Sequence, residues 1–244
     1  MADTPLVLLH GWGMTPRIWN PLRICLSPRL AATPALPGHD GTPSPGATLP
    51  AWSDAVLAGL PERCVLGAWS LGAMVALDLA RRHPQRFKAL VLFGATPCFV
   101  AGPDWAPGLD AGTVRSFTEG FASDSDATLR RFLALQALGE RQRRGVMHSL
   151  SQAVAAPDEY RRDALADGLT VLAGTDLRTQ VADVRVPVHL VHGRDDAVMP
   201  LAAAQWLAHE LPHARLAVFD TCGHAAMVSQ PEACADIVEE ALRD

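Results

Sequence analysis

Gly67-Ala68-Trp69-Ser70-Leu71-Gly72 lies between two apolar segments of different periodicity. The continuous run at 64–66 is typical of a buried strand, and the run at 74–80 has the spacing of a helix. A strand, a single serine and a helix are the layout of a nucleophile elbow, whose sharp turn lifts the hydroxyl above a sheet. The residues two before and two after the serine are usually glycine, and Ala68 departs from that pattern. We interpret Ser70 as a candidate nucleophile, with a serine in an ordinary strand–helix turn as the alternative.

The same alternation of strands and helices extends along most of the chain. Between 113 and 172, however, the pattern indicates helices alone. The whole predicts an α/β fold with a mostly parallel, doubly wound sheet, in which residues 1–97 and 176–244 form the core and residues 98–175 form a helical insertion, the cap. The predicted strands are 6–9, 63–66, 87–93, 186–191 and 216–219, with a weak one at 30–36. The predicted helices are 18–26, 49–60, 71–82, 201–211 and 231–242 in the core, and 127–138, 141–154 and 158–171 in the cap.

Composition limits the class of protein. The 244 residues are 49% hydrophobic and 19% charged, with a net charge of −5, which suits one large globular domain or one with an insertion. The acidic balance disfavours a general nucleic-acid or membrane-surface protein. No apolar run approaches the roughly 20 residues of a membrane-spanning helix. The five cysteines are scattered, and the first residues lack the basic and apolar regions of a signal peptide. These features predict a cytoplasmic protein with free thiols.

Two later segments hold the partners that a nucleophilic serine needs. A serine hydroxyl requires a base to take its proton, and the base requires an acid to orient it. In an open parallel sheet such groups lie at the carboxyl ends of strands. Asp196 and His224 each follow a predicted buried strand, and the order Ser70, Asp196, His224 is one in which catalytic triads occur. Asp195 is the alternative acid.

The loop after the first strand is a candidate for binding the substrate. An oxyanion needs two backbone N–H donors, which we expect from Leu71, directly after the serine, and from Trp12, in that glycine-containing loop. We expect His10 to support the loop. Four aromatic residues are candidates for lining an acyl channel, with plain core packing as the alternative: Trp12, Trp69, Phe117 and Phe132.

The histidines show no spacing that favours a metal. His189 and His192 are three residues apart on a strand, so their side chains point to opposite faces. No glycine-rich phosphate-binding motif follows a strand. We therefore expect neither a metal nor another cofactor. The remaining histidines are expected in loops or on helix surfaces: His39, His83, His148, His209 and His213.

Together these segments resemble the α/β-hydrolase superfamily over nearly the whole chain. More narrowly, the chain is similar to the methyl ester esterases of biotin synthesis. The segment 131–136 is the most specific match, because caps vary most within the superfamily. The resemblance implies that Asp196 is the acid, and that Asp195 caps its loop or faces solvent. The matching segments are 6–13, 69–72, 97–99, 131–136, 175–178 and 224–225.

The resemblance also implies a substrate and a partner. The substrate would be a methyl-capped acyl chain on the phosphopantetheine arm of an acidic acyl-carrier protein, from which the enzyme releases methanol. Arginines of the cap would bind the carrier, and we expect neither nucleic acid nor membrane as a partner. The matching cap positions are Ala127, Arg131, Arg144 and His148, of which two are arginine.

Three further arginines, Arg130, Arg141 and Arg143, are candidates to replace the missing charge, with a solvated helix face as the alternative. Residues 130–148 hold five arginines and one acidic residue, Glu140. Family members usually have an extra strand or hairpin before the strand at 6–9, so we expect a shorter sheet at that edge. We also expect a monomer. The alternative functions are a general short-chain carboxylesterase or thioesterase and, from another class, a non-catalytic ligand-binding protein.

Overall fold

A five-stranded parallel sheet forms the centre of the computed structural model, which describes residues 4–26, 32–154 and 162–243. Neighbouring strands of the sheet follow one another in the sequence, and every pair is parallel. The predicted α/β fold is therefore confirmed. The strands are β1 (Leu6–Leu9), β2 (Cys64–Trp69), β3 (Phe87–Phe93), β4 (Val188–Gly193) and β5 (Ala214–Phe219).

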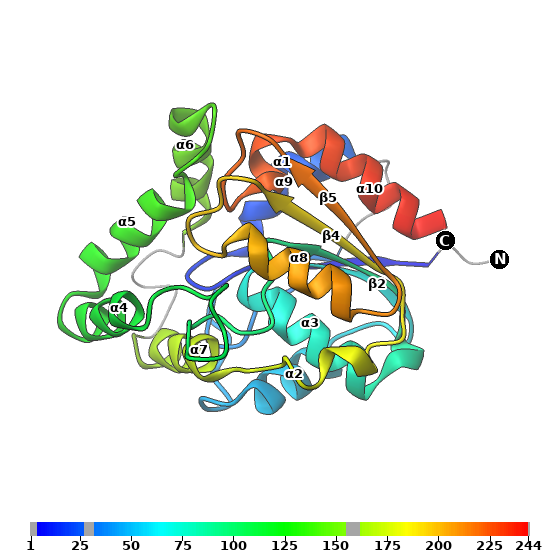
Figure 1. Ribbon diagram of the computed structural model, residues 1–244, viewed down its shortest axis with the longest axis horizontal. Helices are drawn as coiled ribbons and strands as arrows, with labels where there is room; N and C mark the ends of the chain where they lie inside the picture. The colour runs from blue at the N-terminus through cyan, green and yellow to red at the C-terminus, as the bar shows by residue number, and fades with distance from the viewer. Residues whose placement is uncertain (1–3, 27–31, 155–161, 244) are drawn as a thin grey trace.

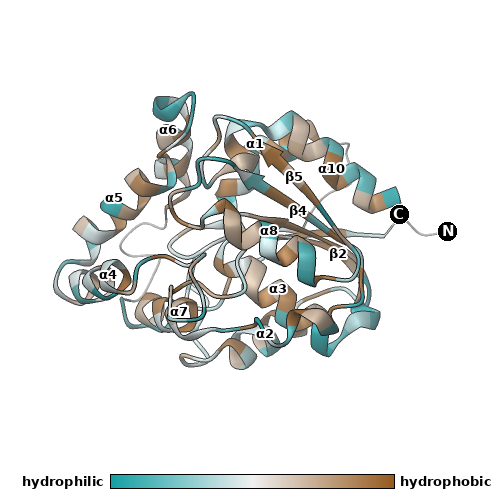
Figure 2. Ribbon diagram, in the orientation of Figure 1, coloured by the Kyte–Doolittle hydropathy of each residue, from teal (hydrophilic) through white to brown (hydrophobic). Residues whose placement is uncertain are grey.

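Helices cover both faces of the sheet, as a parallel sheet requires. In β1, Leu6 and Leu8 pack into one apolar cluster while Val7 and Leu9 pack into the other. β1, β2 and β4 are buried along their whole length, and Figure 2 shows brown along much of the sheet. One face is covered by α2 (Leu49–Ala58), α3 (Leu71–Arg82) and α8 (Leu201–Glu210). The other is covered by α1 (Asn20–Cys25), α9 (Ala226–Ser229) and α10 (Pro231–Arg243).

Within the described residues, four α-helices stand between β3 and β4, and they lie on the side to which the carboxyl ends of the strands point (Figure 1). Asp110 and Asp124 begin the first two of them by accepting hydrogen bonds from backbone N–H groups, as N-caps do. The fourth was predicted to start at 158, but 155–161 lie outside the described residues. The helices are α4 (Ala111–Ser123), α5 (Ser125–Gln136), α6 (Arg143–Ala153) and α7 (Arg162–Gly174).

The weak strand predicted at 30–36 is wrong for the part that the structure describes, 32–36. There, only Ala32 pairs with the sheet, through a parallel bridge to Val7. Its N–H donates to Leu6 O at 3.0 Å, and its carbonyl accepts from Leu8 N at 2.8 Å. Pro34 and Pro37 follow and have no N–H to donate, so they interrupt any longer ladder.

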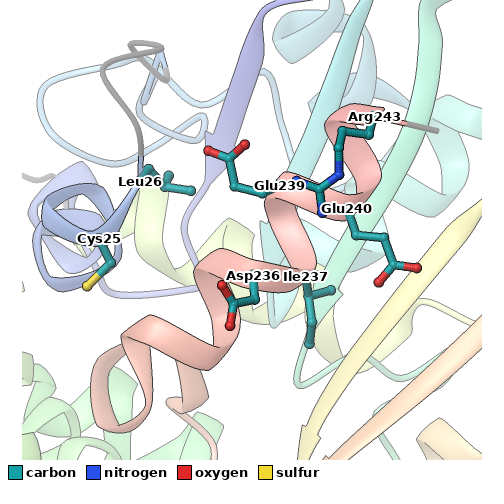
Figure 3. Close-up of a pocket in the computed structure, with 7 residues that line it drawn as sticks. All are labelled: Cys25, Leu26, Asp236, Ile237, Glu239, Glu240 and Arg243. Carbon is teal, nitrogen blue, oxygen red and sulfur yellow. The ribbon is translucent and has the colours of Figure 1, made fainter.

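A surface hollow of about 690 Å³ lies between α1 and α10 (Figure 3). Its walls are the end of α1 and one side of α10, and it contains three carboxylates. No serine or histidine lines it, so it is separate from the predicted triad. The lining residues are Cys25, Leu26, Asp236, Ile237, Glu239, Glu240 and Arg243. None of the helices within the described ranges is long and apolar enough to cross a membrane.

The start of α3 packs so closely on the end of β1 that only glycine fits there. A Cβ at Gly72 would lie 2.5 Å from His10 O and 2.9 Å from Leu9 O, both of them backbone atoms. We expect Gly72→Ala to destabilise the protein by about 1–3 kcal/mol, because overpacking forces the backbone to shift.

The matched control is Gly145→Ala in the exposed first part of α6, where no atom lies within 4 Å of the added Cβ. It should stabilise by about 0.5–1 kcal/mol, since alanine loses less entropy than glycine in a helix. Denaturant unfolding measures both changes, and equal effects of the two substitutions would contradict the close approach.

Candidate active site

Ser70 occupies the sharp turn between β2 and α3. Its backbone has φ 58° and ψ −122°, a conformation that is strained for a residue with a side chain. Two hydrogen bonds hold it there, from Ser70 N to Phe93 O at 3.1 Å and from Ala73 N to Ser70 O at 2.9 Å. Ala68, where the usual pattern has glycine, is fully buried in the core cluster that includes α3. The turn thus has the geometry expected of a nucleophile elbow.

Asp196 and His224 meet in the buried space beyond the ends of β4 and β5. The Nδ1 of His224 lies 2.7 Å from the Oδ2 of Asp196, and both side chains are excluded from solvent. The other oxygen of Asp196 accepts hydrogen bonds from the N–H groups of Val198 and Met199, each at 2.8 Å. Burial raises the pKa of Asp196, but His224, together with His192 and the N–H of Met199, outweighs it and holds that pKa below its usual value. Asp195 is exposed and does not contact His224.

His224 is fixed through its backbone as well as its ring. Its N–H donates to Gln136 O at 3.3 Å, and its carbonyl accepts from the indole N–H of Trp69 at 2.9 Å. The Trp69 and imidazole rings are 5.2 Å apart and tilted. Because Nδ1 bonds to a carboxylate, it is the protonated nitrogen, and Nε2 retains its lone pair. Among the described residues, Nε2 is buried without a hydrogen-bond partner.

Ser70 and His224 are both placed against the end of β3. The N–H of Ser70 bonds to Phe93 O, and a Cβ at Gly94 would lie 2.8 Å from the Nδ1 and Cε1 of His224. The structure therefore brings the predicted nucleophile, base and acid to one edge of the sheet.

His192 is a part of the site that the sequence did not reveal. Its side chain is 1% exposed, and Nε2 lies 2.7 Å from Met199 O and 3.4 Å from the Oδ2 of Asp196. Burial lowers the pKa of His192, so the ring is neutral near pH 7 and donates through Nε2–H. It thereby supports the loop that holds Asp196. The sequence offered one signal from which His192 could have been identified: it stands at the end of β4, four residues before the proposed acid.

Two buried histidines fasten the loop that follows β1. The N–H of Leu36 donates to His10 Nε2 at 3.0 Å, and the N–H of Gly13 donates to His39 Nε2 at 2.9 Å. Each histidine thus accepts a bond from the other's loop, and their rings are 5.2 Å apart. Burial and the neighbouring His39 lower the pKa of His10 to about 3, and burial lowers that of His39 to about 4. Both rings are neutral at pH 7, as acceptors must be. His39 lies in a loop, as expected, but its side chain is fully buried there.

The fastened loop lies directly on the nucleophile. A Cβ at Gly11 would be 2.9 Å from the Cβ of Ser70. Among the residues that the structure describes, no backbone hydrogen bond engages the N–H of Trp12 or of Leu71. These are the two donors that the sequence predicts for an oxyanion hole.

The Trp12 side chain belongs to an aromatic cluster under the cap. Its indole N–H donates to Leu165 O at 2.8 Å, and its ring lies 5.3–5.6 Å from three phenylalanine rings, edge to face. Phe117 and Phe132 of this cluster were predicted, and Phe121 was not. Trp69 lies in the other apolar cluster, next to His224.

The five arginines between 130 and 148 are exposed, on α5 and α6 and in the segment between them. Within the described residues, no ion pair is found for Arg130, Arg131, Arg143 or Arg144, so their charges face solvent. The outer end of α6 is accordingly teal in Figure 2. Of the two uncharged positions, Ala127 is half-buried and His148 is exposed.

The fold and this site define a class of protein. Residues 6–237 match the family model described as "Alpha/beta hydrolase family". The chain belongs to that family. Among solved structures, it is similar to the enol-lactonase from Burkholderia xenovorans LB400 (TM-score 0.84, 18% identity, 100% of this chain and 93% of the other). It is also similar to the bromoperoxidase from Bacillus anthracis (TM-score 0.83, 20% identity, 100% and 93%). At these identities the likeness shows the shared fold.

Closer similarity is found among curated proteins. The chain is 55% identical to the pimeloyl-acyl-carrier-protein methyl ester esterase of Aromatoleum aromaticum, over 249 aligned residues and the full length of both chains. It is 38% identical to the protein of the same name from Nitrosomonas europaea, over 93% of this chain and 91% of that one.

The adjacent aspartates allow a direct test of the acid. Asp196→Asn should lower kcat for ester hydrolysis by about 10⁴, because an amide favours the wrong tautomer of His224. Asp195→Asn changes the same charge on an exposed neighbour and should leave kcat near the wild-type value. Steady-state kinetics on a soluble ester gives both numbers, and similar losses in the two variants would reject Asp196 as the orienting acid.

Proposed function

We propose that this protein is a serine carboxylesterase that hydrolyses the methyl ester of a pimeloyl group carried by acyl-carrier protein. The observation that supports it most is the buried Asp196–His224 pair, placed at the same sheet edge as the strained Ser70. The names of relatives at 55% and 38% identity support the particular substrate. By that analogy the product is a free carboxylate on the carried chain, in biotin synthesis.

The proposed reaction is acyl transfer to water. Ser70 attacks the ester carbonyl while Nε2 of His224 takes its proton, and Asp196 stabilises the imidazolium that forms. The N–H groups of Trp12 and Leu71 stabilise the oxyanion. His224 then protonates the leaving methoxide, which departs as methanol. A water molecule, deprotonated by His224, attacks the acyl-enzyme and releases the carboxylate from Ser70.

The acyl chain would run beneath the cap. The ring of Trp12 packs against Phe117 of α4 and Phe132 of α5, and this apolar wall beside the proposed oxyanion donor suits a chain of methylene groups. Phe121 extends this wall. Trp69 stays a predicted lining residue, although the contacts of its indole point to a role in holding His224.

The arginine-rich face of α5 and α6 would receive the carrier. Exposed guanidinium groups without ion partners attract an acidic protein and guide its approach. Glu140, the one acidic residue between 130 and 148, is buried, so the exposed charges of that stretch are all arginine. The rival is a general carboxylesterase or thioesterase with the same triad. A cytoplasmic location, which free cysteines favour, and a monomeric state stay predictions.

Ser70→Ala tests whether this site performs the chemistry. The variant should fold normally and lose hydrolysis of the carrier-bound methyl ester by at least about 10³-fold, because no other group can form the acyl-enzyme. Methanol release measures the reaction, and growth without biotin of a cell lacking this esterase reports it in vivo. Ser116→Ala, on an exposed position of α4, is the control. Hydrolysis retained by Ser70→Ala would refute the proposal.

The arginine face is tested by comparing two substrates. Arg131→Ala with Arg144→Ala should raise KM for the carrier-bound ester roughly tenfold or more, and the effect should shrink as salt increases. The free methyl ester should be hydrolysed as by the wild type. Arg23→Ala with Arg185→Ala makes the same change of charge at exposed positions outside the cap. Equal losses on both substrates, or in both double variants, would favour the general esterase.

A further inference from the structure

The segment that joins α5 to α6 lies against the loop that carries His224. The carbonyl of Gln136, at the end of α5, accepts the N–H of His224 at 3.3 Å. Farther along, the N–H of Arg141 donates to Thr221 O at 3.1 Å. Residues 136–141, here called the joining segment, therefore hold the histidine loop at two points. The segment stands between the two helices that carry the arginines.

Glycines on both sides show how close this contact is. A Cβ at Gly223 would lie 2.3 Å from Leu138 O, and a Cβ at Gly139 would lie within 2.5 Å of the backbone and Cβ of Asp195. Gly139 also has φ +80°, which disfavours a side chain. The joining segment thus contacts both loops that bear the proposed acid and base.

Glu140 places an acidic side chain inside this contact. It is 7% exposed, and its Cγ is near the position that a Cβ of Gly223 would take, at 3.3 Å. Burial has the largest effect on its pKa and raises it, whereas the amides of Gly223 and Ala225 and the hydroxyl of Ser229 lower it; the net shift is upward. The two amides belong to the residues immediately before and after His224.

Burying a carboxyl group in this way costs free energy that an apolar side chain would not. Among the described residues Glu140 has no ion-pair partner, and neither of its oxygens has a hydrogen-bond partner. No step of the proposed reaction uses it. The groups near its carboxyl are the amides of Gly223 and Ala225, the hydroxyl of Ser229 and the carboxylate of Asp196. Its effect therefore falls mainly on the histidine turn.

We propose that Glu140 is a positioning residue for the catalytic base, holding the His224 turn from the cap side. This inference rests on the proposed function, since it assigns His224 as the base. The carboxyl group lies near the amides on both sides of His224, and Trp69 holds the carbonyl of His224. Without Glu140 the turn can shift, and the imidazole of His224 then loses its fixed orientation. In this proposal the joining segment positions the catalytic base in addition to covering the site.

Kinetics on a small soluble ester, which does not need the carrier, tests this role. Glu140→Ala should lower kcat roughly 10- to 100-fold, the effect of a small misplacement, and leave KM within about twofold. The rate at which a fluorophosphonate labels Ser70 should fall by the same factor, because that reaction also needs the base. Glu140→Gln keeps an oxygen of the same reach and should recover most of both rates. Glu119→Ala, at an exposed position of α4, should change neither.

A purely structural role predicts a different result. If Glu140→Ala lowers the melting temperature but leaves kcat and the labelling rate unchanged, the inference is overturned. Should the alanine variant not fold, Glu140→Thr, too short to reach the amides, is measured in its place with the same expectation. Ser70→Ala in parallel separates the two proposals. Activity in Ser70→Ala refutes the triad, whereas an inactive Ser70→Ala beside a fully active Glu140 variant refutes only the role of Glu140.

Discussion

The position of His224 depends on hydrogen bonds to three different parts of the molecule. Its ring bonds to Asp196 after β4, its carbonyl to Trp69 at the end of β2, and its N–H to Gln136 of the cap. A general base works only when its lone pair is aimed at the proton it takes. Because three separate elements fix one residue, the sheet and the cap must both be in place before the site is aligned.

The loop after β1 has a different constraint, because it must approach Ser70 closely without covering the hydroxyl group. Glycines at 11 and 72 allow that approach, and backbone strain is concentrated at Ser70. The neutral rings of His10 and His39 hold the loop in place: His39 accepts the N–H of Gly13, and His10 accepts the N–H of Leu36. A protonated ring could not accept these bonds. Deep burial, which keeps the pKa of both rings low, is therefore what allows histidine to serve as a structural acceptor near pH 7.

The sequence predicted the groups whose place follows from strand ends, and missed those that depend on contacts between distant loops. Ser70, Asp196 and His224 each follow a strand of the parallel sheet, and parallel strands bring such residues to one edge whatever surrounds them. His39 accepts a backbone N–H of a distant loop, and the role proposed for Glu140 likewise depends on a distant turn; no local pattern encodes either. His192 bonds within the loop after its own strand, so its place before Asp196 was the one signal available. The strand expected at 30–36 has suitable apolar residues, but its prolines leave only the bridge at Ala32 in the described part.

In the proposed function, recognition of the carrier and alignment of the base would be linked through one stretch of chain. The arginines that would meet the carrier stand on α5 and α6, and the segment between these helices contacts the turns of Asp195 and His224. A carrier that pulls on the arginines therefore acts on the same elements that orient the base. Binding energy from a remote part of a substrate can raise the rate only if it reaches the reacting groups. The joining segment would transmit this binding energy from the arginines to the histidine turn over a short stretch of chain, which a cap attached only at its ends would lack.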